Sequence, residues 1–181
     1  DGKLLLFQGG QPRRLGILDV DSRTRKEVIR HPQFSVFSGS ISPDGRWVAF
    51  FVRVQPNRSR IYVAPFPGWS ASLPIPEASW VPITSGEGEV DKPRWSPDGN
   101  TLYFASLQDG FFCLWAQRLD PRTRGAVGAP SAVHHFHQAR LSMMNVRQDF
   151  REISVARDKI VFALTERTGN IWLARSENAS R

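Results

Sequence analysis

The stretch Ser-Pro-Asp-Gly-Arg-Trp-Val-Ala-Phe, residues 42–50, returns as Ser-Pro-Asp-Gly-Asn-Thr-Leu-Tyr-Phe at residues 96–104. The two turns lead into apolar runs that align residue by residue, and their aspartates, Asp44 and Asp98, lie 54 positions apart. A repeat of this length is typical of stacked copies of one supersecondary unit. The sequence therefore predicts a repeat architecture before any single residue is interpreted.

Two weaker copies extend the series. Residues 1–7 match the template without its front half, and residues 155–162 match it with a two-residue deletion. A second apolar run follows each turn by roughly 12 to 16 residues, which suits two short strands and their connection. These second runs are residues 15–20, 61–66, 114–119 and 171–174. We therefore expect one domain over residues 1–181, with repeats at approximately 1–35, 36–88, 89–148 and 149–181.

The residue chemistry is that of strands. The apolar runs are rich in Val, Ile, Leu, Phe, Tyr and Trp, and Gly, Pro, Asn and Asp bound them. With 14 Gly and 13 Pro among 181 residues, long helices have little room. The predicted fold class is all-β.

Repeats of this length suit the four-stranded antiparallel blade of a β-propeller. One blade is apolar on both faces, so it must stack on its neighbours to bury them. The first copy lacks its leading strand and the last lacks its trailing strand, so we expect four blades of a larger ring of roughly six to eight. Four blades that close on themselves are the alternative. The aromatic residues expected between blades are Trp47, Phe50, Tyr62, Trp95, Tyr103, Phe104, Trp115 and Trp172.

The repeated turns are predicted to be structural. Asp44 and Asp98 can accept backbone hydrogen bonds across the turn, and the proline fixes one backbone dihedral. Gly45 and Gly99 supply a conformation that other residues resist. We therefore assign these four residues to the scaffold and not to catalysis.

Composition narrows the functional classes. The formal net charge is +7 and the sequence pI is near 10.5, but the arginines are scattered among turns, so a nucleic-acid partner is not expected. No run reaches the roughly 18 apolar residues of a membrane span. The single cysteine, Cys113, excludes an intramolecular disulfide and is expected to be buried and inert.

The segments that lead from one blade to the innermost strand of the next are the expected recognition surface, because they gather near one mouth of a propeller and loops on a rigid scaffold commonly bind. They are residues 31–39, 86–94 and 134–151. Arginines at such a mouth can hold a carboxylate or phosphate, with solvated loop charge as the alternative. The candidate rim residues are Glu89, Asp91, Lys92, Arg94, His135, His137, Arg140 and Arg147.

The histidine-rich segment at residues 134–137 is the most suggestive local cluster, since neutral imidazoles bind zinc, copper and nickel. On a strand, His135 and His137 share one face while His134 points away. No carboxylate or cysteine lies close in sequence, and three-ligand geometry would need a partner from another blade. We therefore predict a polar edge strand or rim loop here, and no metal site.

Signatures of catalysis are missing from the sequence. It contains no Gly-x-Ser-x-Gly elbow, no His-Glu-x-x-His pair and no phosphate-cradling Gly-x-x-x-x-Gly-Lys loop. We therefore expect no enzyme activity and no cofactor, and any catalytic domain would lie outside this chain.

Residues 95–104, Trp-Ser-Pro-Asp-Gly with Leu-Tyr-Phe after two more residues, resemble the repeat of the TolB-type, WD40-like (PD40) propellers of bacteria. The Gly-His and Trp-Asp pairs of eukaryotic WD40 repeats are absent. Residues 95–137 and 168–173 are similar to C-terminal propellers that are often fused to serine/threonine kinase domains or winged-helix regulators. The resemblance implies a bacterial binding platform without naming its ligand.

The resulting functional prediction is a non-catalytic propeller module that presents rim loops to a protein or small ligand within a larger bacterial sensor, regulatory or envelope protein. It would also contact the remaining blades of its own polypeptide. The alternative is the substrate-gating propeller of a prolyl-oligopeptidase-type serine peptidase whose catalytic domain is not in this chain. A third option is a TolB-like envelope scaffold, so the compartment stays open, with the periplasm as one possibility.

Overall fold

The computed structural model describes residues 2–69, 73–138, 140–169 and 173. Its regular structure is β-strand apart from two short 3-10 helices, η1 (Glu77–Ser79) and η2 (Gln148–Phe150). Nothing helical in that part of the chain has the length and hydrophobicity that a membrane span requires. The predicted all-β fold class is confirmed.

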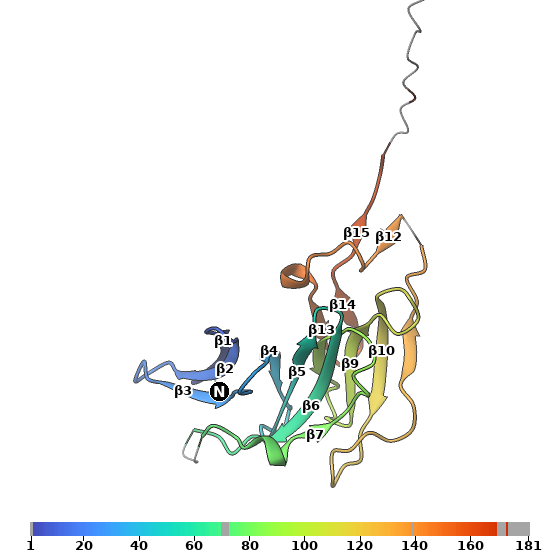
Figure 1. Cartoon of the computed structure of the whole chain (residues 1–181). Helices are drawn as coiled ribbons and strands as arrows, with labels where there is room; N and C mark the ends of the chain where they lie inside the picture. Colours follow the sequence, from blue (N-terminus) through green and yellow to red (C-terminus); the bar gives the residue numbers. More distant parts are fainter. Residues whose placement is uncertain (1, 70–72, 139, 170–172, 174–181) are drawn as a thin grey trace, which may run out of the picture.

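Three antiparallel sheets follow one another along the chain (Figure 1), and in each sheet the strands neighbour one another in chain order. The first sheet consists of β1 (Leu4–Gly9), β2 (Arg14–Asp19) and β3 (Arg25–Ile29). The second consists of β4 (Ser35–Ile41), β5 (Trp47–Gln55), β6 (Arg58–Pro65) and β7 (Val81–Pro82). The third consists of β8 (Val90–Trp95), β9 (Thr101–Ser106), β10 (Cys113–Arg118) and β11 (Ser131–His134). The second and third sheets are the four-stranded blades that the repeat predicts.

A fourth unit begins with the hairpin of β13 (Ile153–Val155) and β14 (Ile160–Phe162), which coincides with the fourth sequence copy. Two short strands, β12 (Leu141–Ser142) and β15 (Thr165–Glu166), pair with each other. Of the apolar run expected at residues 171–174, only residue 173 belongs to the described part of the chain. Trp172 and Asp1, which the sequence placed in a blade and a turn, lie outside it.

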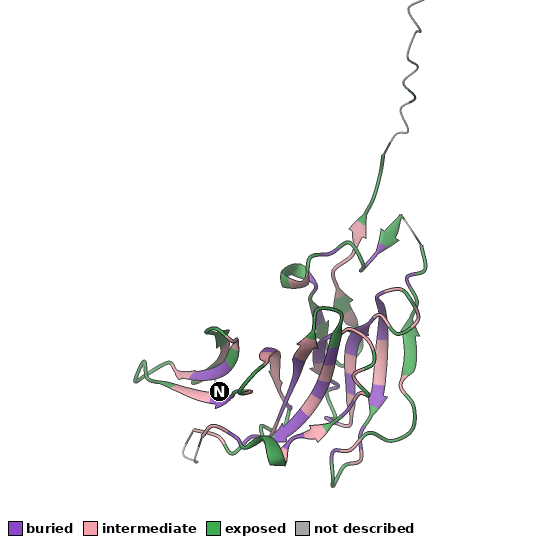
Figure 2. Ribbon diagram, in the orientation of Figure 1, coloured by how far each residue is buried: buried purple, intermediate pink, exposed green. Residues whose placement is uncertain are grey.

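Hydrophobic clusters fill the spaces between successive sheets. Buried residues accordingly recur along the strands of these sheets (Figure 2). β5 shows why both faces of a blade are buried, because successive side chains on a strand point to opposite faces. Phe50 packs into a cluster with residues of β2 and β3, whereas Phe51 packs into a second cluster with residues of β8 and β9. In a third cluster, Leu114 of β10 meets Ile153 of β13. The sheets are therefore stacked face against face, as in a propeller.

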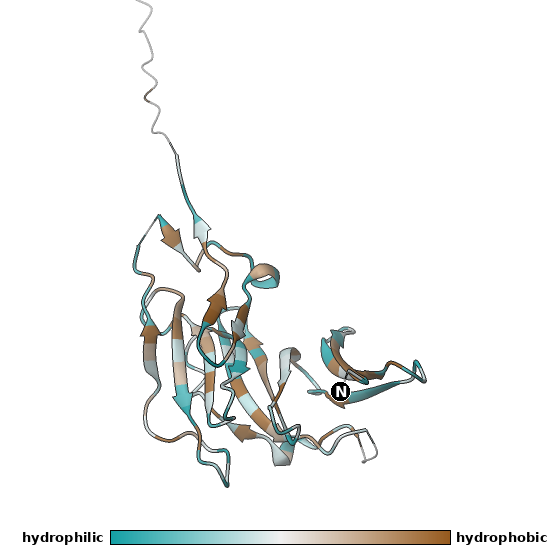
Figure 3. Cartoon of the chain, turned by 180° about the vertical axis from the view of Figure 1, so that it is seen from behind, coloured by the Kyte–Doolittle hydropathy of each residue, from teal (hydrophilic) through white to brown (hydrophobic). Residues whose placement is uncertain are grey.

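The aromatic residues predicted to fill these spaces contribute to different degrees. Seen from behind, apolar residues recur along the strands of the stacked sheets (Figure 3). Phe50, Trp95 and Phe104 are buried in the clusters. Four others are half-buried and pack against the same clusters, namely Trp47, Tyr62, Tyr103 and Trp115.

The two Ser-Pro-Asp-Gly turns have the same internal hydrogen bonds. In both, the serine hydroxyl donates to the aspartate, and Oδ1 of Asp44 or Asp98 accepts a backbone N–H two residues later at 3.1 Å. Gly45 and Gly99 have φ angles of 69° and 71°, in the left-handed region that favours glycine. The hydroxyl of Ser42 is the main cause that lowers the pKa of Asp44 to about 2.

The buried side chain of Arg124 connects these turns of neighbouring blades. Its Nη1 donates to the carbonyl oxygen of Gly99 at 2.7 Å, and its Nη2 lies 3.7 Å from Oδ2 of Asp44. The guanidinium also lies 5.6 Å from the ring centre of Trp47 and 6.0 Å from that of Trp95. One cation therefore joins the two copies of the repeat.

Candidate functional site

The first strands of the second, third and fourth units lie together, with β8 in contact with both β4 and β13. Each of β4 and β8 carries a register shift, between Phe37 and Ser40 and between Asp91 and Arg94. Bulges of this kind re-aim side chains and occur next to functional sites.

The two bulges are copies of each other. Ser38 and Lys92 lie 54 positions apart, the same interval that separates the repeated aspartates, and have φ angles of 52° and 53°. Left-handed backbone is unfavourable for residues other than glycine, and such residues cluster where the fold has a use for them. The repeat therefore places one polar residue with left-handed backbone on the first strand of the second sheet and one on the first strand of the third.

The bulges face a shared hollow of about 180 Å³. Ser38 lines it from β4, Lys92 and Arg94 line it from β8, and Glu152 lines it from the residue before β13. Lys92 Nζ lies 2.7 Å from Oε1 of Glu152, and Arg94 Nη2 lies 3.0 Å from Oε2. Two predicted rim residues thus converge on one carboxylate of the next blade.

Asp91 and Arg151, the sequence neighbours of Lys92 and Glu152, form a buried ion pair. Arg151 Nη1 is 3.1 Å from Oδ2 of Asp91, and their side chains are 5% and 0% exposed. The Arg151 guanidinium also donates to the carbonyl oxygen of Val146 at 3.2 Å and lies 3.6 Å from the ring centre of Phe112. Burial raises the pKa of Asp91 to about 6, although Lys92 and Arg151 act in the opposite direction. Burial likewise lowers the pKa of Arg151.

The remaining rim candidates lie in other places. Glu89 Oε1 is 3.7 Å from Arg53 Nη2. Arg140 pairs with Glu166 at 2.6 Å, and Arg147 lies 3.7 Å from Asp149. His135 and His137 both contact Asp109 at the turn between β9 and β10. The structure therefore places Asp91, Lys92 and Arg94 in the contacts with Arg151 and Glu152, Glu89 beside Arg53, Arg140 and Arg147 in the exposed segment after β11, and His135 and His137 at the Asp109 turn.

Sequence reasoning missed Glu152, Arg53 and Asp109. Each is brought to its partner by strand pairing or by stacking of blades, and none has a motif of its own. The equivalence of Ser38 and Lys92 could have been predicted from sequence, because the 54-residue repeat interval aligns their two strands.

Residues 140–150, which we call the rim segment, expose apolar side chains. Leu141, Met144 and Phe150 are 40%, 44% and 65% exposed. Arg147 lies over Phe150 at 5.6 Å from the ring centre, and Arg140 and Arg147 have side chains that are about three-quarters exposed. Exposed Met, Phe and Arg together are characteristic of protein interfaces.

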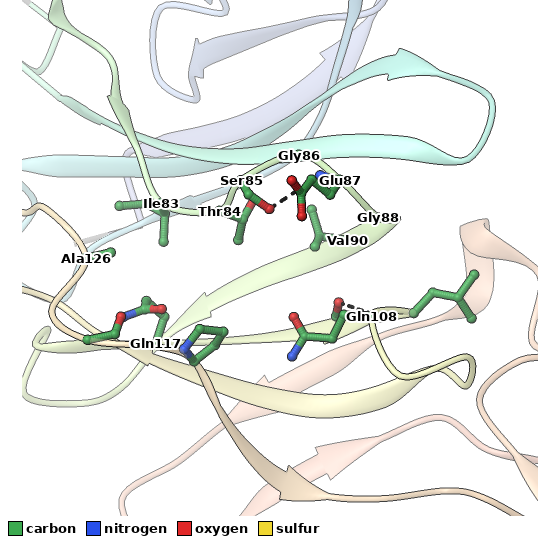
Figure 4. A pocket seen from close by; sticks show the side chains of 14 residues that line it. Ile83, Thr84, Ser85, Gly86, Glu87, Gly88, Val90, Gln108, Gln117 and Ala126 are labelled. Carbon is green, nitrogen blue, oxygen red and sulfur yellow. Dashed lines mark hydrogen bonds between the residues drawn. The ribbon is translucent and has the colours of Figure 1, made fainter.

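A pocket of about 420 Å³ lies between the β7–β8 connection and the strands of the third sheet (Figure 4). Its polar side chains include Ser85, Glu87, Gln108 and Gln117. Gln117 Nε2 lies 3.0 to 3.2 Å from three backbone carbonyl oxygens, among which its two N–H groups are shared. Among the described residues that line it there is no His, Cys, Lys or Arg.

Comparison with solved structures supports the propeller assignment. The chain matches TolB from Acinetobacter baumannii with a TM-score of 0.61 and 14% identity, over 92% of this chain and 39% of that one. It matches puromycin hydrolase with a TM-score of 0.59 and 17% identity, over 84% of this chain and 23% of that one. For the β-propeller domain of the Trilobed protease from Pyrococcus furiosus, the TM-score is 0.53 with 18% identity, over 90% of this chain and 45% of that one. The fold is therefore that of a TolB-like β-propeller.

Sequence comparison is less specific. The Uncharacterized protein Atu1656 of Agrobacterium fabrum (strain C58 / ATCC 33970) is 29% identical over 114 residues, which cover 44% of this chain and 39% of that protein. No protein-family model matches the chain. The chain spans less than half the length of each of these proteins.

Proposed function

We propose that this chain is a non-catalytic β-propeller module that recognises a protein partner through its rim segment. The observation that carries the proposal is the exposure of Met144 and Phe150 beside Arg140 and Arg147 on a rigid stack of blades. A few aromatic and arginine side chains provide most of the binding energy at protein interfaces. The alternative form of this proposal is that the rim segment binds a small ligand.

The fold holds the rim segment in place without covering it. Arg151, at its end, is fixed by Asp91 and Val146, and Met143 is fully buried in the third hydrophobic cluster. Neighbouring Met144 is left exposed. Binding side chains on an anchored segment lose little conformational freedom when a partner docks.

Site-specific photo-crosslinking tests the proposal. A photoreactive phenylalanine analogue at position 150 should give a discrete covalent adduct in cells of the producing organism, and Arg147→Glu should abolish that adduct. The matched control is position 127. Val127 is 46% exposed and follows the C-terminal end of β10, whereas the segment after β11 begins beside the N-terminal end of β10. Equal labelling at positions 150 and 127, or adducts that persist in the Arg147→Glu protein, would contradict the proposal.

We further propose that residues 1–181 form part of a single propeller domain within a larger bacterial sensor, regulatory or envelope protein. The 62% exposure of Val161 on β14 supports this view, because a further blade would cover an apolar side chain at this position. The sequence of the complete gene tests it. An upstream serine/threonine kinase or winged-helix domain favours a regulator, and an upstream signal peptide favours an envelope scaffold.

The second candidate is a propeller that gates a serine peptidase. The similarity to puromycin hydrolase and to the propeller domain of the Trilobed protease favours it. A hydrolase domain encoded downstream of Arg181 is the expected finding for this candidate. Its absence from the complete gene would leave the binding module as the better account.

A further inference from the structure

Four potential metal ligands converge at the outer end of the third sheet. Asp109 lies in the turn between β9 and β10, Cys113 is the first residue of β10, and His135 and His137 follow β11. Their ligand atoms all lie within 4.8 Å of one another. We propose that these four side chains form a binding site for a zinc ion.

The four ligands are distant in sequence and meet only through the pairing of strands in the folded sheet. β10 and β11 pair antiparallel with Leu114 opposite His134, so the residues that follow β11 lie beside the start of β10. His135 and His137 flank Phe136, which is 5% exposed and points into the third hydrophobic cluster. The alternation predicted from sequence thus directs both imidazoles to one side, and the missing carboxylate and thiol come from the same blade.

The carboxylate is oriented as a ligand. Oδ2 of Asp109 lies 2.9 Å from Nδ1 of His135 and 2.9 Å from Nε2 of His137, whereas Oδ1 accepts the backbone N–H of Phe111 at 3.3 Å. Burial acts to raise the pKa of Asp109, but the hydrogen bonds from His137, the Phe111 N–H and His135 bring it below its ordinary value. One oxygen is therefore held by the backbone while the other faces both imidazoles.

Outer contacts hold the remaining ligands. The ring of Phe111 lies 4.7 Å from that of His137, and the ring of Trp115 lies 5.7 Å from that of His135. The backbone N–H of Phe136 donates to Sγ of Cys113 at 3.3 Å. Supporting contacts of this kind orient ligands and tune them in metal sites.

The donor set suits zinc. Tetrahedral zinc with bonds of about 2.0 to 2.3 Å separates its ligand atoms by about 3.3 to 3.8 Å. The more distant pairs of the cluster, which lie within 4.8 Å, would move closer, whereas Oδ2 of Asp109 would move slightly away from the two imidazole nitrogens at 2.9 Å. The imidazoles are 49% and 44% exposed, which leaves them room to move. With four protein ligands the site is closed and structural. Because zinc binds the thiolate, binding must release the proton of the Cys113 thiol.

The position of the site indicates what the ion would do. Phe136 lies 5.2 Å from the ring of Phe162 in β14 and packs in the cluster that includes Met143 and Ile153. A zinc ion would thus hold residues 135–137 against the start of β10 and stabilise the packing of the third sheet on the fourth unit. This role does not depend on which partner the rim segment binds.

Titration of the purified protein, free of any polyhistidine tag, with zinc and cobalt tests the proposal. We expect one ion per chain, a micromolar or tighter dissociation constant, a cobalt spectrum with tetrahedral bands and a thiolate charge-transfer band, and a higher melting temperature with zinc. His135→Gln, His137→Gln and Asp109→Asn should each weaken binding by at least about tenfold. His134→Gln is the matched control, because this imidazole belongs to the same segment and lies outside the cluster.

Absence of the thiolate band, or equal affinity in the His134→Gln and His137→Gln proteins, would overturn the assignment. Zinc binding that is equally weak in all variants would also overturn the assignment. The cluster would then be a group of histidines hydrogen-bonded to Asp109. Circular dichroism of each metal-free variant shows whether it is folded. A substitution at buried Cys113 could prevent folding. His135 and His137 are exposed, so variants at these two positions still test the site.

Discussion

Replacement of Arg151 by Met should destabilise the protein strongly at pH 7. The substitution keeps much of the side-chain volume over Phe112 but leaves the fully buried Asp91 without its cation. Removing one member of a buried ion pair costs about 3 to 5 kcal/mol, because the other charge stays desolvated. Asp91 then escapes part of that cost by taking up a proton, so the loss should be smaller at pH 5 than at pH 7.

Urea denaturation followed by tryptophan fluorescence measures this effect. Arg140→Met is the control, because Arg140 is 74% exposed and its pair with Glu166 lies at the surface, where ion pairs contribute about 0 to 1 kcal/mol. The double variant Asp91→Asn/Arg151→Met should recover a large part of the loss, since neither charge remains. If Arg151→Met and Arg140→Met have the same free energy of unfolding, the buried pair does not have the role assigned to it.

Two further predictions concern pH and the repeated turn. Because burial raises the pKa of Asp91 to about 6 in the folded protein, the native state binds this proton more tightly, and the free energy of unfolding should fall by about 3 kcal/mol as pH rises from about 3 to 7. Denaturation at several pH values checks this, and an identical profile in Asp91→Asn would disprove it. Gly99→Val should cost about 1 to 3 kcal/mol, because its φ of 71° is unfavourable for a branched side chain. Gly9→Val, at a glycine with no described atom within 4 Å of an added Cβ and no left-handed backbone, is the control; equal melting temperatures of the two variants would show that the turn tolerates other residues.

The blades could be predicted from sequence because their determinants are local. Each Ser-Pro-Asp-Gly turn is closed by hydrogen bonds between residues at most five positions apart, and the apolar runs identify the strands that follow. The repeat interval then aligned the blades. This is why the fold class, the antiparallel sheets and the TolB-like architecture all followed from one chain.

The site was less predictable because its contacts are distant in sequence. Asp91 and Arg151 lie 60 positions apart, and their pairing depends on how two blades stack. Asp109 meets His135 only after β10 and β11 have paired, so a search of neighbouring residues missed it. The roles of the rim residues in recognition stay predictions, since composition and spacing do not identify a partner.

The central claim is that β5 presents adjacent aromatic residues to two different seams between blades. Double-mutant cycles with the mild substitution Phe→Leu test it directly by urea denaturation. Phe51 and Phe104 share one cluster, so their cycle should show a coupling energy of at least about 0.5 kcal/mol. Phe50 packs in the other cluster, so its cycle with Phe104 should be additive within about 0.3 to 0.5 kcal/mol. Coupling of Phe104 to Phe50 and not to Phe51 would contradict the stacked-blade account.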